Sequence, residues 1–139
     1  MEEIKFVIPL NSTTKKNSQQ IIRNRKTGKQ LIVQNPKYLK YEHDCKQYIP
    51  ELHIDYPINL KAVYYRKTKH RVDLINLHGA LHDILIKCGC ILDDNCNIIV
   101  STDGSRVYYD KDNPRTEVTI TKIGEELWLR NYGMGVLKL

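Results

Sequence analysis

Hydrophobic and polar positions along this chain follow two different periods, which together predict a mixture of strands and helices. In 58–65, Leu60, Ala62 and Tyr64 alternate with Lys61 and Tyr65, as in a strand with one buried face. Short apolar runs bounded by turn residues predict further strands at 4–8, 90–92, 98–101, 107–109 and 117–123.

The helical period is clearest after Asp73. An apolar stripe recurs there at spacings of three and four residues, formed by Leu74, Leu77, Leu81, Leu85 and Cys88. Gly89 follows where a helix-ending residue belongs, and Asp73 stands where an N-cap side chain belongs. The pattern therefore predicts one regular amphipathic helix.

A second helix is expected to follow Pro36 and to stop at Pro50, with Leu39, Cys45 and Ile49 as its apolar positions.

Two turns predict hairpins. Thr27-Gly28 separates the apolar pairs of a long polar segment, which predicts a basic and exposed hairpin. Asp103-Gly104 has the composition of a tight hairpin turn that leads into 107–109.

These elements predict a single α/β (α+β) domain, a mixed sheet with two main helices on one face. The 139 residues suffice for an ordinary core. Residues 1–123 are interpreted as this domain. Residues 124–139 are interpreted as an extension, because their apolar residues suit docking on the domain or on a second subunit.

The charge distribution favours a polyanionic partner. The 22 Lys and Arg residues exceed the 16 Asp and Glu residues, which gives a net charge of +6. No acidic residue lies between Glu3 and Glu42, and a second basic cluster at 66–71 stands directly before Asp73. Phosphate contacts are therefore expected from both regions. The candidate DNA-binding residues are Lys15, Lys16, Arg23, Arg25, Lys26, Lys69 and Arg71.

Other features bear on the compartment. No apolar run is long enough to cross a bilayer, and Glu2 and Glu3 stand where a signal peptide would be basic, so we expect a cytoplasmic protein without membrane partners. The four cysteines are expected to be reduced. A zinc site is the alternative, but Cys88 and Cys90 are spaced by one residue instead of two to four.

The acidic residues suggest metal chemistry. Asp103, Asp110 and Asp112 are explained by turns, whereas the adjacent carboxylates of Asp93 and Asp94 repel each other, a cost that a cation would remove.

The stretch RVDLINLHGALHDILIKCGCILDDN, residues 71–95, resembles the signature of the RusA family of Holliday junction resolvases. The resemblance spans nearly everything before Gly124 and includes the N-terminal Lys15-Lys16 region, as in relatives from Gram-positive bacteria and their phages. It implies a homodimer that resolves four-way DNA junctions by paired, Mg²⁺-dependent cuts, with Mn²⁺ expected to be tolerated.

The resemblance also implies roles for individual residues. The acids that would bind metal and act in catalysis fall on Asp73, Asp93 and Asp94, and the family's helix-opening asparagine and helix aspartate fall on Asn76 and Asp83. The family's second acid is Ile75 here, and a lysine that supports catalysis is Gly79.

The spacing along the helix refines these assignments. Asp83 lies about 15 Å along the helix from Asp73, too far to share an ion, so it is assigned to the polar helix face or to a contact with DNA or a second subunit. Asn76 is close enough to be a neutral metal ligand, and equally suits a helix start. His78 and His82 have metal-site spacing, but without a third ligand they are interpreted as surface histidines.

The backbone at Ile75 is left open: if extended, its side chain would face the metal with Asp73, and if helical it would face elsewhere.

Three functions remain open. The leading one is a Mg²⁺-dependent endonuclease acting on branched DNA. The second is a branched-DNA-binding protein with weak or lost cleavage, as Ile75 and Gly79 would permit. The third is a metal-dependent enzyme acting on a small phosphorylated molecule.

Overall fold

The computed structural model describes residues 3–15 and 19–124. The expected extension therefore lies outside the described residues from 125 onward. Along the chain the elements are β1 (Glu3–Ile8), β2 (Gln19–Arg23), β3 (Gln30–Gln34), α1 (Pro36–Cys45), the 3₁₀ turn η1 (Lys46–Tyr48), β4 (Ile58–Arg66), α2 (Leu74–Lys87), β5 (Ile99–Ser101), β6 (Arg106–Tyr109) and β7 (Arg115–Lys122).

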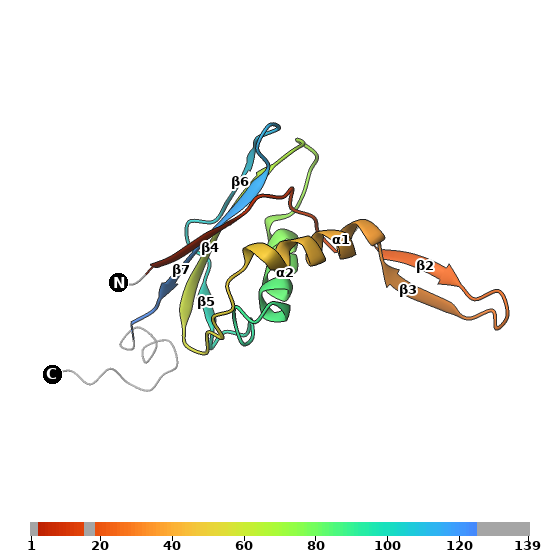
Figure 1. The fold of residues 1–139 in the computed structure, drawn as a ribbon, viewed down its shortest axis with the longest axis horizontal. Helices are drawn as coiled ribbons and strands as arrows, with labels where there is room; N and C mark the ends of the chain where they lie inside the picture. Colours follow the sequence, from red (N-terminus) through yellow and green to blue (C-terminus); the bar gives the residue numbers. More distant parts are fainter. Residues whose placement is uncertain (1–2, 16–18, 125–139) are drawn as a thin grey trace.

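The main sheet is mixed, as predicted, and its order is β1-β7-β4-β5 with β6 also paired to β4. β7 runs antiparallel to both β1 and β4, whereas β5 and β6 run parallel to β4. Both helices lie against one face of this sheet (Figure 1), which confirms the predicted layers.

The core lies between that face and the helices. Ile8, Leu60, Ala62, Tyr64, Val118 and Ile120 are buried on the sheet side. α2 buries Leu77, Ala80, Leu81, Ile84 and Leu85 against them. The alternating residues of the strands and the apolar stripe of α2 therefore form one core. Full burial of each large aliphatic side chain stabilises the folded protein by on the order of 2 kcal/mol.

α2 ends as the sequence predicts. Gly89 has a φ of +74°, which is the left-handed region that favours glycine. The N–H of Cys90 donates to the Leu85 carbonyl at 2.9 Å, and the N–H of Gly89 donates to the Ile86 carbonyl at 3.0 Å. These two bonds form a Schellman motif, which satisfies carbonyls that the helix end would leave unpaired.

α1 begins as expected but presents a different face to the core. The Asn35 side chain accepts from the Lys37 N–H at 2.8 Å, and Pro36 occupies the first turn. Leu39 was expected on the apolar face but is 49% exposed. Cys45 is buried as predicted, and Tyr38 and Tyr41 share its side of the helix in place of Leu39, because residues spaced by three and four lie on one helix side.

The predicted basic hairpin is confirmed. β2 and β3 pair antiparallel in their own two-stranded sheet, with Arg23 opposite Gln30. Gly28 has a φ of +71° in the connecting turn, where its N–H donates to the Asn24 carbonyl at 2.8 Å. Figure 1 shows the hairpin projecting from the rest of the molecule.

Two predictions in the region after α2 are wrong. Asp103-Gly104 does form a tight turn, with Gly104 at a φ of +88°, but β5 and β6 on either side of it both run parallel to β4, so they are not a hairpin. The turn separates β5 from β6, which pair with β4 one after the other. At the turn the Ser105 hydroxyl accepts from the Ala62 N–H at 3.0 Å. Residues 90–92 form no strand, only a bridge from Ile91 to Ile54.

Among the helices that the structure describes, none is long and apolar enough to span a bilayer.

Candidate functional site

Asp73 is the residue immediately before α2. Its backbone is extended, with a φ of −89° and a ψ of 131°, and its side chain makes no capping hydrogen bond to the helix. The expected N-cap role is therefore absent, although the position is that of the cap. The Asn76 side-chain amide donates to the exposed Asp73 carboxylate at 3.2 Å, so these two polar groups form a pair at the start of the helix.

Asp93 and Asp94 lie on the exposed loop between α2 and β5. One Asp93 carboxylate oxygen accepts from the Asp94 N–H at 2.7 Å, and the other accepts from the Asn95 amide at 3.1 Å. The partial burial of Asp94, followed by its contact with Asp93, raises the pKa of the Asp94 carboxyl, and the charge of Asp83 adds to this effect. Crowded carboxylates of this kind favour a bound cation.

The helix α2 separates the two acidic positions within one chain. Asp73 stands at its start, and the 14 residues of α2 advance about 21 Å. The acidic loop leaves from the other end, where the Leu92 N–H donates to the Ile54 carbonyl and the Ile58 N–H to the Ile98 carbonyl. Within 3–15 and 19–124, no group of three or more His, Cys, Asp or Glu side chains is arranged to hold a metal ion.

Asp83 lies on α2 and is half-buried. Its carboxylate forms an ion pair with the Lys15 ammonium, which also lies 5.9 Å from the centre of the Tyr38 ring. The N-terminal segment is thereby fastened to α2. Gly79 lies one helical turn before Asp83, and a Cβ built there meets no atom within 4 Å, so a lysine would be tolerated sterically at that position.

His78 and His82 are not surface histidines, so that interpretation is wrong. Their rings stack with centroids 5.5 Å apart, and the Nε2 atoms of both are buried without a hydrogen-bond partner in the described part of the chain. The Tyr64 hydroxyl lies 2.8 Å from His78 Nδ1. Burial lowers the pKa of both histidines, that of His82 to about 4, so both are neutral at pH 7.

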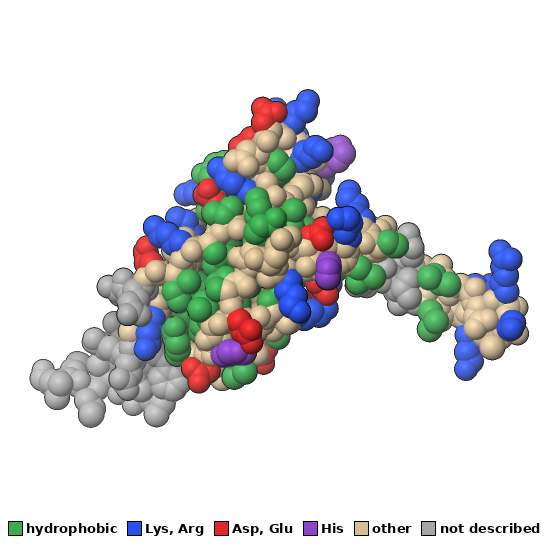
Figure 2. All heavy atoms as spheres, viewed as in Figure 1, with side chains coloured by type: hydrophobic (Ala, Val, Ile, Leu, Met, Phe, Trp, Pro, Cys, Tyr) green, Lys and Arg blue, Asp and Glu red, His purple; other side chains and the backbone are tan. Residues whose placement is uncertain are grey.

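The candidate DNA-binding residues divide into two places. Arg23, Arg25 and Lys26 are exposed on the hairpin, and Figure 2 shows Lys and Arg side chains gathered at its tip. Lys69 and Arg71 lie on the loop before α2, with the Lys69 ammonium 4.9 Å from the Tyr109 ring centre. Lys16 lies outside the described residues.

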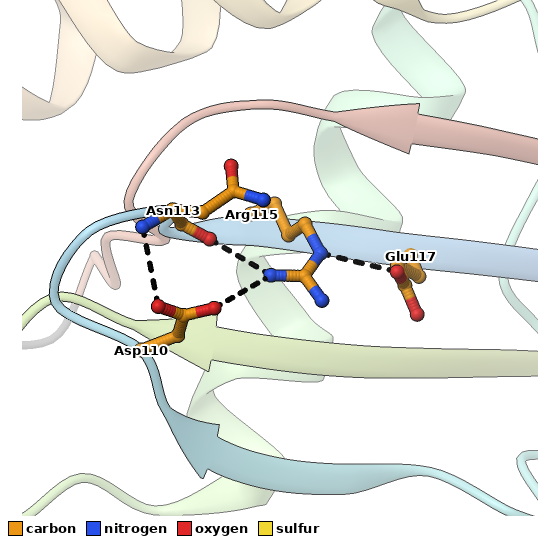
Figure 3. A network of polar contacts seen from close by, with 4 residues as sticks. All are labelled: Asp110, Asn113, Arg115 and Glu117. Atoms are coloured by element: carbon orange, nitrogen blue, oxygen red, sulfur yellow. Dashed lines mark hydrogen bonds and ion pairs between the residues drawn. The ribbon is translucent and has the colours of Figure 1, made fainter.

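Sequence reasoning missed a polar network at the far end of the sheet. The Arg115 guanidinium bridges Asp110 at 3.0 Å and Glu117 at 3.1 Å, and also donates to the Asn113 carbonyl (Figure 3). It lies 3.7 Å from the Tyr65 ring centre. These contacts fix the turn between β6 and β7. Only the alternation of charges at 110–117 hinted at them.

The backbone at Ile75 is helical, because α2 begins at Leu74. The Ile75 side chain is 82% exposed. It therefore diverges from Asp73 and is not packed in the core.

Ile75→Asp is expected to raise the free energy of unfolding by about 0.3–1 kcal/mol, because the first turn of α2 holds no acidic residue and its helix dipole favours one. Urea denaturation measures this change, with Ile75→Asn as the uncharged control. A loss of several kcal/mol would show that Ile75 is buried in solution.

Two comparisons with known proteins bear on this site. The sequence model of the family described as endodeoxyribonuclease RusA matches residues 9–121 of the 139. The match spans both acidic positions, the basic hairpin and both helices. A search among curated proteins found no match.

Proposed function

Because the chain belongs to the endodeoxyribonuclease RusA family, we propose that it hydrolyses phosphodiester bonds in branched DNA, with four-way junctions as the preferred substrate and Mg²⁺ as the cofactor. The family match carries this proposal, since residues 9–121 include every described helix and strand except β1 and the last residue of β7. The surplus of basic residues supports a DNA substrate.

Asp93 and Asp94 are the residues that fit Mg²⁺ best. Mg²⁺ usually keeps several waters and binds through one or two carboxylates together with substrate phosphates, so two adjacent carboxylates suffice. The pKa of Asp94 is raised mainly by burial, with its contact to Asp93 and the charges of Asp83 and Asp93 adding to this effect, and a bound cation would offset the part that comes from these carboxylates. When bound, Mg²⁺ would activate water and stabilise the charge that develops on the phosphate.

The chain's own groups would do the rest of the work. The Asn95 amide and the Asp94 N–H orient the Asp93 carboxylate before substrate arrives. Asp73 and Asn76 at the start of α2 remain candidate ligands, and their participation with Asp93 and Asp94 stays a prediction. We further propose that the protein acts as a homodimer, because paired cuts on a two-fold substrate need two sites.

The second candidate function is a branched-DNA-binding protein with weak or lost cleavage. Ile75 and Gly79 favour it, because they replace the acid and the lysine that the resemblance implies. Both functions predict tight binding to a four-way junction. A cleavage assay with Mg²⁺ separates them: paired nicks support the nuclease, and binding without nicks supports the binding protein. Binding with no preference for branches would contradict both.

The hairpin is expected to contact backbone phosphates. Replacing Arg23, Arg25 and Lys26 together by Gln should lower the slope of log affinity against log salt by about two to three, since each phosphate contact contributes about 0.9. Stability should not change, because these side chains are exposed and outside the core. Binding of a labelled junction, measured at several salt concentrations, gives the slope.

The matched control removes three charges from the main sheet, with Lys5, Lys61 and Lys122 changed to Gln. If both triple variants lose the same slope, the hairpin has no special role, and net charge alone explains binding.

A further inference from the structure

A hollow of about 370 Å³ lies between the N-terminal segment 11–14, the start of α1 and the loop that precedes α2. Asn11 and Lys67 connect two of these segments, because the Asn11 side chain accepts from the Lys67 N–H at 2.8 Å. The hollow is therefore built from segments far apart in the sequence, and the hydrogen bond between Asn11 and Lys67 holds two of them together. It lies outside the acidic loop described above.

The side chains that line this hollow are basic and polar. Lys37, Arg66 and Arg71 line it together with His70, and none of its described lining residues is Asp or Glu. None of these three cations forms an ion pair with a described carboxylate. Three unpaired cations around one hollow attract an anion.

Arg66 is the most constrained of these cations. Its Nη1 donates to the His70 carbonyl at 2.8 Å, which fixes the guanidinium, while its Nε is buried and has no acceptor among the residues that the structure describes. Partial burial lowers the pKa of Arg66, and no described carboxylate forms an ion pair with its charge. A bound anion would supply both the acceptor and the opposite charge.

Ser12 gives an independent sign of a missing partner. It lines the hollow, is only 3% exposed, and its hydroxyl has no hydrogen-bond partner in the described structure. A buried unpaired hydroxyl costs roughly 1–3 kcal/mol, and buried polar groups in native proteins are usually paired. An oxygen of a bound anion would give this hydroxyl the acceptor that it lacks.

We propose that this hollow binds one phosphate of the DNA backbone, with Arg66 and Ser12 donating to its oxygens and Lys37 and Arg71 supplying further positive charge. A phosphate offers the several acceptor oxygens that these donors need. The volume also leaves room for an adjoining sugar. Since Val72 lines the hollow and Asp73 follows it, the bound strand would pass beside Asp73. The choice of DNA as the phosphate's source rests on the proposed function.

Inorganic phosphate is the probe that tests this site directly. Titration at constant ionic strength, followed by amide NMR shifts, should move signals in 11–14 and 66–72. Arg66→Gln should weaken this binding by about tenfold or more, since it removes the charge and with it a charge-assisted hydrogen bond. Lys40→Gln is the control, because Lys40 is paired with Asp44. Absence of shifts in both segments, or equal affinity of Arg66→Gln and the unchanged protein, would overturn the proposal.

Ser12→Ala covers the case in which Arg66→Gln does not fold. It removes one hydroxyl and should weaken phosphate binding about threefold to tenfold; unchanged affinity in that variant would also overturn the proposal. Junction binding by Arg66→Gln should show a salt slope lower by about one. Phosphate binding without any junction binding would support the phosphate site and contradict the proposed function. Junction cleavage without phosphate binding would contradict the phosphate site and support the proposed function.

Discussion

Asp94→Asn is expected to reduce cleavage of a four-way junction by about 100-fold or more, while junction affinity stays equal or rises. The amide keeps the size of the side chain but removes the charge that would hold Mg²⁺, and a loss of about 10²–10³ is typical when one group that stabilises the transition state is removed. Affinity is maintained because the carboxylate repels phosphate when no metal is bound.

The measurement is single-turnover cleavage with Mg²⁺, together with gel-shift binding in its absence. Asp112→Asn is the matched control, since it changes the same charge at an exposed turn. Cleavage by Asp94→Asn at the rate of the control would remove Asp94 from the site. Equal losses in both variants would point to net charge as the cause.

Lowering the pH from 6.5 toward 4 is expected to destabilise the protein through His82. Burial lowers the pKa of His82 in the folded protein to about 4, with the charge of His78 adding to this effect and that of Asp83 opposing it. The unfolded chain takes up a proton near pH 6.5, so the stability that His82 contributes is complete above 6.5 and is lost as the pH falls toward 4. The gap corresponds to about 3 kcal/mol.

Urea denaturation at several pH values measures this effect, and His82→Gln isolates it from the carboxylates that also titrate. The difference in unfolding free energy between the two proteins should shrink as the pH falls through this window. His43→Gln, on the exposed side of α1, should follow the unchanged protein throughout. A difference that is constant with pH would mean that His82 titrates in the folded state as it does in the unfolded chain.

The sequence predicted those elements whose signals are local. The end of α2 depends on Gly89 and the residues before it, and the hairpin depends on a turn and two short runs, so neighbouring residues contain the information. The face of α1 was mispredicted because Leu39 and Tyr38 both suit an apolar position. Which of them is buried depends on the distant strands and on α2.

In the candidate site, too, the sequence predicted the local features and missed those that depend on distant segments. The identity and spacing of Asp93 and Asp94 are visible in the sequence, but the two ends of their loop, Leu92 and Ile98, are held by bonds to Ile54 and Ile58, which depend on pairing between distant segments. His78 and His82 appeared exposed for the same reason, because the groups that cover them come from elsewhere in the chain. The hollow around Ser12 and Arg66 joins positions more than fifty residues apart, and no local motif marks it.

The position of β7 between β1 and β4 determines when this domain can assemble. β7 is the last strand in sequence among residues 3–15 and 19–124, yet it supplies the neighbour of both β1 and β4. During synthesis the main sheet therefore remains open until Lys122 has left the ribosome, and β1 waits for a partner more than a hundred residues away. Such long-range pairing slows folding relative to local contacts. The helices and the hairpin, by contrast, have only local pairs to form and can begin to order while the rest of the chain is still being made.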